Sequence, residues 1–374
     1  MSKREHNSRE SQSTVGKTQN GGHVVFVTGA AGYIGAMLVQ LIAARSDVAK
    51  VIGLDKESVP ELIEHESKLT YIQANTADIA AWSDQVAKLA PDVVIHTAWQ
   101  IREMYGKQRE QWRWNVTGSD NIFELALTLP SVKKLIYFST VASYGAFPSN
   151  TVDHFYKEDE PFRQTDYLYA EEKRVVEEHL RSRYLAAKQH GSVPQVFIIR
   201  PAAITGPRGR YTRIRFGLQS ALSGSLKGQK SKLYDLISLM VSWVPATPKW
   251  LRQYVHEDDI ADVVTLFAFQ DLAGEYEAFN VAPPGDVVFG RDMAAAVGKR
   301  ILPVRPWMVR LAFFVMWHLT RGRVPTSRGS WKGYSYPIAV DGSKLTKLYG
   351  YQYKWPSKEA FVKKEGRYMK YVQV

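Results

Sequence analysis

A tyrosine and a lysine stand four residues apart in the stretch DYLYAEEKRVVEEHL, residues 166–180. The Glu- and Lys-rich pattern predicts a helix, and residues four apart share one face of a helix. A phenol with a pKa near ~10 is a weak base at neutral pH, but a neighbouring ammonium stabilises the phenolate and lowers that pKa. Tyr169 and Lys173 are therefore a candidate pair for moving a proton to or from an alcohol or a carbonyl.

The spacing by itself is not specific, because the chain has 20 tyrosines and Tyr184–Lys188 repeats it. What distinguishes Tyr169 is the run YFSTVASYG, which places Ser139 and Thr140 at the carboxyl end of an expected strand. A hydroxyl there can bind a substrate oxygen and pass a hydrogen bond to the tyrosine. Tyr184 has no such company, and we expect it to be a surface aromatic. An ordinary helical pair is the alternative for Tyr169 as well.

A glycine-rich turn, VTGAAGYIGAMLVQLI, follows the first apolar run and opens an expected helix. Gly29 permits the sharp turn, Gly32 lets a pyrophosphate approach the backbone, and Gly35 lets the helix pack on the sheet. The helix N-terminus offers free N–H groups to the anion. Asp55 ends the next apolar run, where a carboxylate accepts from the adenosine ribose and favours NAD over NADP, although the adjacent Lys56 weakens that preference.

Two further positions fit the same predicted pocket. Asp78 in NTADI follows the third apolar run and can accept from the adenine amino group, or it is a helix N-cap. HTAWQ, residues 96–100, ends the fourth run, where ligands sit in parallel sheets. We interpret His96 itself as a packed strand-end residue and not as a catalyst.

The elements that must position these residues alternate along the chain from residue 23. Short apolar runs without period-two alternation are typical of strands covered on both faces, and segments of helical length lie between them. This order predicts an α/β fold, a Rossmann-like doubly wound parallel sheet with a smaller interleaved C-terminal substrate-binding region. The six predicted strands are residues 23–28, 50–55, 68–74, 91–98, 134–140 and 195–201.

The same pattern predicts the domain boundaries. The polar residues 1–22 are expected to be a disordered tail. Residues 23–205, with part of 251–282, are expected to form the NAD-binding domain. Residues 206–250 and 283–374 are expected to form the substrate-binding region.

The composition limits the chemistry. The chain has no cysteine, which excludes disulfides, thiolate metal sites and cysteine nucleophiles, and we predict no metal. The net charge of +12 favours an anionic partner, but the basic residues do not alternate with aromatics as in a base-stacking surface, so we expect no nucleic acid. No apolar run of signal-peptide length begins the sequence, and we expect a cytoplasmic protein.

Together these motifs identify a family resemblance. The chain resembles the extended short-chain dehydrogenases/reductases, the NAD-dependent epimerase/dehydratase group, from about residue 23 to its end. The resemblance rests on motifs in the family's order, namely TGAAGYIG, Asp55, Asp78, WNVTGSDN with Asn115, STVASYG, Tyr169-x-x-x-Lys173, IIRPAAITGP, YVHEDDIADV and VDGSKLTKLYG.

The resemblance implies a role for each site residue. Tyr169 is the acid/base, Lys173 binds the nicotinamide ribose and tunes the tyrosine, and Thr140 supplies the hydroxyl, with Ser139 as its alternative. Hydride transfer between a substrate carbon and NAD is the implied reaction. Val141 and Ala142 stand where dehydratases often have acidic residues, which argues against dehydration. The implied NAD contacts are Gly29, Gly32, Tyr33, Ile34, Gly35, Asp55, Asp78, Ile79, Thr97, Ala98, Asn115, Tyr169, Lys173 and Pro201.

A nucleotide sugar is the substrate that the resemblance favours. Arg252 resembles the arginine that grips the diphosphate, and a guanidinium suits phosphate. Arg208, the first of an arginine cluster that includes residues 210–215, is a second candidate, or that cluster is a solvated loop. A homodimer is also implied, with residues 171–179 at the contact.

The segment ILPVRPWMVRLAFFVMWHLTRGR, residues 301–323, supports a rival interpretation. Its apolar part is too short to span a bilayer, so it is a buried helix, or residues 303–319 lie on a membrane surface anchored by Trp307 and Trp317. The second reading favours a dehydrogenase of a lipophilic alcohol, of hydroxysteroid or lipid-linked type. A catalytically idle NAD sensor is the third hypothesis, but a sensor does not need Thr140, Tyr169 and Lys173.

Overall fold

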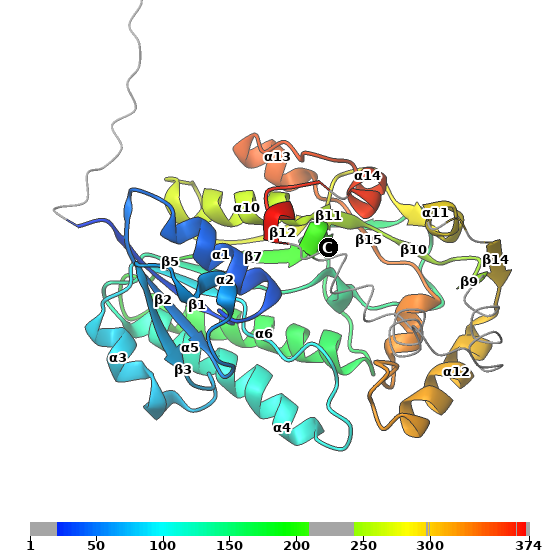
Figure 1. Cartoon of the computed structure of the whole chain (residues 1–374), viewed down its shortest axis with the longest axis horizontal. Helices are drawn as coiled ribbons and strands as arrows, with labels where there is room; N and C mark the ends of the chain where they lie inside the picture. The colour runs from blue at the N-terminus through cyan, green and yellow to red at the C-terminus, as the bar shows by residue number, and fades with distance from the viewer. Residues whose placement is uncertain (1–20, 209–242, 297, 299, 364, 372–374) are drawn as a thin grey trace, which may run out of the picture.

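A parallel sheet of seven strands organises the computed structural model, which describes residues 21–208, 243–296, 298, 300–363 and 365–371 (Figure 1). The strand order is β12-β7-β5-β4-β1-β2-β3, and every neighbouring pair is parallel. The order reverses between β1 and β4. In such a sheet ligands bind at the carboxyl ends of the strands beside the reversal. The predicted Rossmann-like doubly wound sheet is confirmed.

The strands agree closely with the apolar runs of the sequence. Six of them begin and end within a few residues of the predicted ranges, and the seventh, β12, lies in the part of 251–282 that was assigned to the same domain. The strands are β1 (His23–Thr28), β2 (Val48–Asp55), β3 (Leu69–Gln73), β4 (Val93–His96), β5 (Lys134–Phe138), β7 (Gln195–Pro201) and β12 (Tyr276–Val281).

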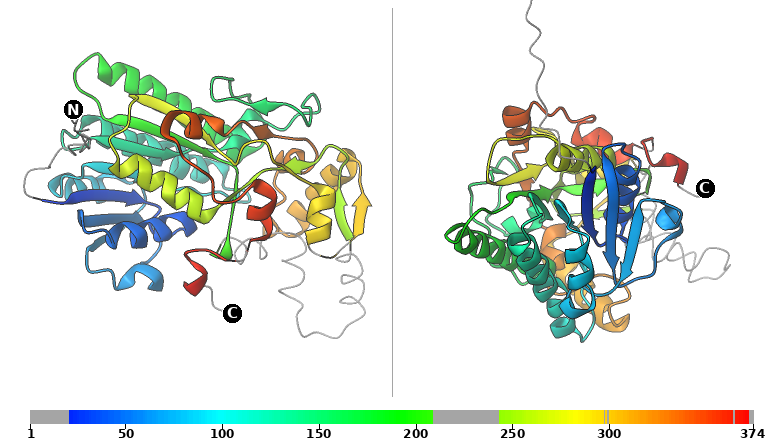
Figure 2. Two further views of the ribbon diagram at one scale, coloured as in Figure 1. Left: turned by 90° about the horizontal axis from the view of Figure 1, so that it is seen from above. Right: turned by 90° about the vertical axis from the view of Figure 1, so that its left-hand side faces the viewer.

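Helices cover both faces of this sheet (Figures 1 and 2). On one face, α1 (Tyr33–Ala43) and α10 (Glu257–Phe269) share a core with Val25 and Val27 of β1. On the other face, α3 (Ser83–Lys88), α5 (Gly118–Thr128) and α6 (Leu168–Lys188) pack against Phe26. Consecutive strand residues point to opposite faces, so burial on both faces explains why the strands are apolar throughout.

Shorter elements complete the chain. Four two-stranded pairings join β8 (Ala203–Thr205) to β11 (Tyr254–His256), β9 (Trp243–Ala246) to β14 (Arg300–Pro303), β10 (Leu251–Arg252) to β13 (Val288–Phe289), and β6 (Phe155–Tyr156) to β15 (Ala339–Val340). The remaining helices are α2 (Glu61–Glu64), α4 (Gln108–Trp112), α11 (Gly290–Ala296), α12 (Pro306–Leu319), α13 (Ser343–Tyr349), α14 (Ser357–Val362), and the short η1 (Ile79–Ala81), η2 (Arg113–Thr117), η3 (Val141–Tyr144), η4 (Ser330–Tyr334) and η5 (Met369–Tyr371).

The elements α11, α12, β9 and β14 lie beyond one end of the sheet (Figures 1 and 2). They belong to the ranges predicted to bind substrate, and that assignment stays a prediction. The predicted tail lies outside the described residues except for residues 21 and 22.

The apolar segment 301–323 contains α12, and its expected burial is wrong. Trp317 is the one buried residue of α12, packed 5.4 Å from the ring centroid of Tyr105. Trp307 is 61% exposed. Trp317 therefore cannot serve as a surface anchor, whereas Trp307 can. Among the described residues no helix is long and apolar enough to cross a bilayer.

Candidate functional site

The glycine turn between β1 and α1 is closely packed. Gly29 has a φ of +73°, and a Cβ there would lie 2.6 Å from the amide nitrogen of Ala98. A Cβ on Gly35 would lie 1.9 Å from the carbonyl oxygen of Gly29, so α1 rests directly on the turn. A Cβ on Gly32 would lie 3.1 Å from the same oxygen. Two of the three positions admit no side chain, as a backbone cradle for phosphate requires.

Asp55 ends β2 beside this turn. Its carboxylate accepts from the amides of Ala31 and Glu57, each at 3.0 Å. Lys56 pairs with Glu57, and its ammonium lies 4.9 Å from the ring centroid of Trp114. The two amide hydrogen bonds fix the carboxylate at the carboxyl end of β2, where the sequence predicts the adenosine ribose.

Asp78 and Ile79 are exposed in the connection after β3. Asp78 directly precedes η1, yet its side chain makes no capping hydrogen bond. The carboxylate instead pairs with Arg113 at the start of η2. Asp78 thus occupies the N-cap position of η1 without capping it through its side chain, and the adenine contact stays a prediction.

The end of β4 is tied to the end of β1. The Thr97 hydroxyl donates to the carbonyl oxygen of Thr28 at 2.7 Å, and the amide of Ala98 donates to the Thr28 hydroxyl at 3.4 Å. His96 is fully enclosed, with Nδ1 2.6 Å from the Thr28 hydroxyl and Nε2 2.8 Å from that of Ser119. Burial, then the charge of Lys173, lowers the pKa of His96 to about 3. The interpretation of His96 as a packed strand-end residue is confirmed.

Lys173 lies in the second turn of α6 with 3% of its surface exposed. Its ammonium donates to the carbonyl oxygen of Phe138, the last residue of β5, and lies 3.6 Å from the ring centroid of Trp99. Burial lowers the pKa of Lys173 well below its ordinary value, against the opposing charges of Glu172 and Glu177. The fold thus holds this cation at the edge where the sequence predicts the cofactor.

Tyr169 lies one helical turn before Lys173, with a half-buried side chain. Its ring centroid is 5.7 Å from that of Tyr167. Burial, then Glu177, then Tyr169 raise the pKa of Tyr137 in β5, so Tyr169 lies within electrostatic reach of that strand. The structure thus holds Lys173 at the carboxyl end of β5 and Tyr169 one helical turn before it on α6.

Tyr184, the other tyrosine with a lysine four residues later, is buried and not at the surface as expected. Tyr184 is 4% exposed and packs with its ring centroid 4.9 Å from that of Tyr276. Lys188 pairs with Glu275. The expectation of a surface aromatic is wrong, because the aromatic ring fills the core between α6 and β12. Tyr184 lies near the other end of α6 and is a buried structural residue.

Two hydroxyls follow β5 directly. Ser139 is 2% exposed, and among the described residues its Oγ atom has no hydrogen-bond partner. Thr140 is 5% exposed and accepts from the amide of Ala142 at 3.2 Å, which caps η3. A buried unpartnered hydroxyl is costly unless a ligand satisfies it. Ser139 therefore competes with Thr140 for the role of substrate-binding hydroxyl. Pro201 ends β7, the neighbour of β5, at the same edge.

Glu172 is a site residue that the sequence analysis missed. It is fully buried and accepts from the side-chain amides of Asn115 at 2.7 Å and Gln111 at 3.2 Å. Asn115 also exchanges hydrogen bonds with the backbone of Gln100, at 2.7 and 3.0 Å. Burial raises the pKa of Glu172 to about 7, against the opposing hydrogen bonds of Asn115 and Gln111. The network joins the loop after β4 to the residue beside Lys173. In the sequence, Glu172 could have been noticed as a carboxylate directly before the candidate lysine.

Asn115 lies in η2, a π-helical turn that joins α4 to α5. Such turns carry an extra residue in the helix and often occur at functional sites. Here the turn places the Asn115 amide between the Gln100 backbone and Glu172. These contacts connect Asn115 to the residue beside Lys173, and the implied contact of Asn115 with the cofactor stays a prediction.

Arg252, the predicted diphosphate arginine, packs on an aromatic ring. Its guanidinium carbon is 4.8 Å from the ring centroid of Tyr334, and an Nη atom donates to the carbonyl oxygen of Gly333 at 3.5 Å. Burial raises the pKa of Tyr167. Tyr169 also raises the pKa of Tyr167, whereas the positive charge of Arg252 lowers it. Both side chains are therefore within electrostatic reach of Tyr167. Tyr167 thus lies between the two, with its ring 5.7 Å from that of Tyr169 and within electrostatic reach of Arg252.

Arg208 lies elsewhere, beside the glycine turn. One of its Nη atoms donates to the carbonyl oxygen of Tyr33 at 3.4 Å, and its amide donates to Glu257 at 3.3 Å. Glu257 also accepts from the Tyr33 hydroxyl. These contacts place Arg208 at the N-terminus of α1, on the predicted cofactor side. The rest of the predicted arginine cluster, residues 210–215, lies outside the described residues.

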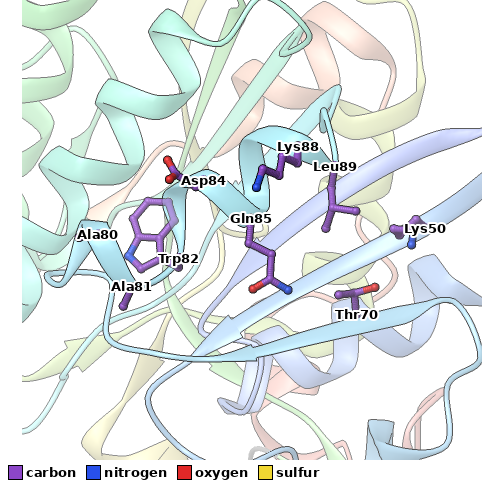
Figure 3. Close-up of a pocket in the computed structure, with 9 residues that line it drawn as sticks. All are labelled: Lys50, Thr70, Ala80, Ala81, Trp82, Asp84, Gln85, Lys88 and Leu89. Atoms are coloured by element: carbon purple, nitrogen blue, oxygen red, sulfur yellow. The ribbon is translucent and has the colours of Figure 1, made fainter.

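A pocket of about 520 Å³ opens between α3 and the first halves of β2 and β3 (Figure 3). It is lined by Lys50, Thr70, Ala80, Ala81, Trp82, Asp84, Gln85, Lys88 and Leu89. None of these is a predicted site residue. Lys50 and Thr70 belong to the amino-terminal halves of their strands, away from the edge that carries Tyr169 and Lys173. We do not assign this pocket to the site.

Comparisons with known proteins agree with the geometry. A model of the NAD dependent epimerase/dehydratase family matches residues 25–282, well over half of the chain. The curated relatives include the 3 beta-hydroxysteroid dehydrogenase/Delta 5-->4-isomerase of vaccinia virus (strain Copenhagen), 27% identical over 198 residues, which are 51% of this chain and 55% of the viral protein. The match thus spans about half the length of that relative.

Solved structures with the same fold cover nearly the whole chain. Bordetella bronchiseptica WbmG in complex with NAD and UDP has a TM-score of 0.66 at 20% identity, covering 95% of this chain and 97% of that chain. UDP-glucose 4-epimerase of Thermotoga maritima with UDP-glucose has a TM-score of 0.64 at 18% identity, covering 91% of this chain and 96% of that one. At such identities these likenesses show the fold.

Proposed function

Because the chain belongs to the NAD-dependent epimerase/dehydratase family, we propose that Tyr169 exchanges a proton with the oxygen of a substrate whose carbon is oxidised or reduced by NAD. NAD is the cofactor of this family, and when bound it accepts or returns a hydride at the nicotinamide. The observation that carries the proposal is the position of the buried ammonium of Lys173 at the end of β5, one helical turn after Tyr169.

The described residues fit NAD. A Cβ at Gly29 or Gly35 would collide with backbone, which leaves a bare turn at the N-terminus of α1 for a pyrophosphate. Asp55 holds its carboxylate beside that turn through two amide hydrogen bonds, which fits a ribose acceptor. Lys173 lies farther along the same edge of the sheet, at the place that suits the second ribose.

The proton step depends on electrostatics. A cation near Tyr169 stabilises its phenolate and brings the phenol closer to the pKa of a useful base. The ammonium of Lys173 is that cation. It is fixed in position by its hydrogen bond to the Phe138 carbonyl oxygen and by its contact with the ring of Trp99. The hydroxyl of Ser139 or Thr140 orients the substrate oxygen toward Tyr169.

A nucleotide sugar is the substrate class we propose. Arg252 packs on Tyr334 and lies within electrostatic reach of Tyr167, the ring neighbour of Tyr169. A guanidinium recognises a diphosphate through paired hydrogen bonds. The structural neighbours named above were solved with UDP or UDP-glucose. In an epimerase, a type of isomerase, the hydride returns to the sugar and no net reduction of NAD results.

A lipophilic alcohol is the second candidate substrate. The exposed apolar helix α12 contacts the substrate side directly, because the ring centroid of Phe313 lies 5.1 Å from that of Tyr334. Tyr334 in turn packs on Arg252. The vaccinia relative, whose name is that of a hydroxysteroid dehydrogenase, favours the same candidate. This reaction would accumulate NADH.

The two candidates are separated by one assay on the NAD-loaded protein. UDP- and dTDP-sugars and a panel of sterols are added, and NADH absorbance and sugar epimers are measured. The proposal expects epimer formation without net NADH, and about a tenfold or larger loss of sugar affinity in Arg252→Ala. The matched control is Arg163→Ala, which removes another partly buried arginine. Net NADH with sterols would replace the first candidate by the second, and no turnover with either panel would contradict both.

Pairing of two copies stays a proposal. The contact that the resemblance implies, residues 171–179, lies on α6, next to α5. There His179 Nδ1 lies 3.1 Å from a carboxylate oxygen of Asp120 on α5, and Glu171 pairs with Arg174 on α6 itself. Sedimentation equilibrium of the wild type and of Glu178→Lys, a charge reversal on an exposed side chain within that range, tests it. The cytoplasmic location likewise stays a prediction.

A further inference from the structure

The helix α12 presents an apolar stripe to solvent. Trp307, Leu311, Phe314 and Val315 follow one another at spacings of four, seven and eight residues from Trp307, so they share one face of the helix. Trp307 and Phe314 are each 61% exposed. The exposed apolar set also includes Met308 and Leu319 of α12, and Ile301 and Leu302 of the adjacent β14.

The opposite face of α12 is attached to the rest of the molecule. Trp317 packs against Tyr105, and Phe313 against Tyr334. The helix therefore has a fixed orientation, with one face bound to the protein and the other outward. It lies at the periphery, at the opposite side of the molecule from β1, β2 and β3 (Figure 1).

The charge around this stripe has one sign. The sequence contains no acidic residue from Met293 to Val340. The described basic residues of this stretch are Arg300, Arg305, Arg310, Arg321, Arg323, Arg328 and Lys332. Lys332 pairs with Asp166. Arg305, Arg321 and Arg323 are exposed and form no ion pair with a carboxylate among the described residues.

We propose that α12 and β14 dock this face on an anionic lipid bilayer. An apolar stripe with an exposed tryptophan, flanked by arginines, matches a helix that lies in the headgroup region with its apolar side in the acyl boundary. The exposed arginines Arg305, Arg321 and Arg323 complement anionic lipid, and the net charge of +12 acts in the same direction. Two copies of the chain joined through this face would bring two acid-free basic surfaces together, which disfavours a homodimer here.

This docking does not depend on which substrate the site takes. It places Tyr334 and Arg252 close to the bilayer, because Phe313 on the inner face of α12 contacts Tyr334. The membrane would then lie on the substrate side of the protein.

The test is sedimentation of the full-length protein with sucrose-loaded vesicles of phosphatidylcholine alone or with phosphatidylserine. The wild type is expected to bind the mixed vesicles more tightly. Trp307→Ser/Leu311→Ser/Phe314→Ser and Arg305→Gln/Arg321→Gln/Arg323→Gln should each lose about tenfold in affinity. All of these side chains are exposed, so folding is retained, and unchanged thermal unfolding checks it. Leu185→Ser/Leu348→Ser, which removes two exposed leucines elsewhere, should bind like the wild type.

Three results would overturn the proposal. The first is a wild type that binds neither type of vesicle, and the second is binding that neither variant weakens. The third is a wild type that dimerises in sedimentation equilibrium while the Trp307 triple variant is monomeric, since a second copy would then be the occupant. Because vesicle binding is measured without substrate, its outcome does not depend on the proposed enzymatic function.

Discussion

The Nζ atom of Lys173 lies 3.6 Å from the centroid of the Trp99 ring, so a buried ammonium rests on an indole face in the loop after β4. The same ammonium donates to the carbonyl oxygen of Phe138 at the end of β5. A cation held by a ring face and a carbonyl has few other positions to occupy. The lysine is therefore positioned before any ligand binds, and its charge acts on whatever phenol lies one turn earlier on α6.

Replacement of that ammonium should change the pH dependence of catalysis. In Lys173→Met, loss of the cation raises the pKa of Tyr169, because an opposite charge no longer favours the phenolate. Turnover should fall by about 10²-fold, and the pH–rate profile should move toward alkaline pH. Lys188→Met, which removes a surface lysine of the same helix, is the control. A lowered rate with an unmoved profile would limit Lys173 to cofactor binding.

The glycine turn predicts unequal effects of two alanine substitutions. In Gly35→Ala the new Cβ would lie 1.9 Å from the Gly29 carbonyl oxygen, and unfolding by urea should show a loss of about 3 kcal/mol. In Gly32→Ala the corresponding distance is 3.1 Å, and the loss should be below about 1 kcal/mol. NAD titration of the folded Gly32→Ala protein should nonetheless show weaker binding. Equal stability losses would mean that α1 does not rest on the turn.

Glu172 predicts a dependence of stability on pH. Its folded-state pKa of about 7 is above the ordinary value of 4.5, so between these pH values the folded protein holds a proton that the unfolded chain has lost. The protonated carboxyl of Glu172 therefore favours the folded state at low pH, and this stabilisation is lost as the pH rises through about 7. Glu172→Gln keeps an acceptor for Asn115 but does not titrate.

The free energy of unfolding of Glu172→Gln, minus that of the wild type, should therefore increase between pH 5 and pH 8, by up to about 3 kcal/mol. Urea titrations at the two pH values measure it. Glu178→Gln, which removes an exposed carboxylate of the same helix, is the control. A difference that stays constant with pH would show that the buried carboxyl is not protonated in the folded protein.

Much of this architecture was predictable from the sequence. Burial on both faces forces continuous apolar strands, so β1, β5 and β7 could be recognised from their residues alone. The glycine turn was predictable because its steric requirement is local. The Tyr169–Lys173 pair was identified through Ser139 and Thr140, which follow β5 directly.

Contacts between distant segments were not predictable. The partners of Lys173 and Asn115, namely Trp99 and Glu172, follow from packing between α6 and the loop after β4. Tyr184 was expected at the surface because an aromatic residue in a charged helix fits either environment. The exposure of α12 could not be predicted either, because nearly all of its residues are apolar and a buried face cannot be distinguished from an exposed one.

The central claim is that the phenol of Tyr169 moves the proton, and Tyr169→Phe tests it most directly, since it removes one oxygen and keeps the ring. NAD affinity and turnover are measured on this variant and on Tyr184→Phe, which alters the buried tyrosine near the other end of α6. For Tyr169→Phe the account predicts NAD binding within about twofold of the wild type and turnover lower by about 10²- to 10⁴-fold, with Tyr184→Phe turning over like the wild type. Turnover of Tyr169→Phe within a few-fold of the wild type would contradict it.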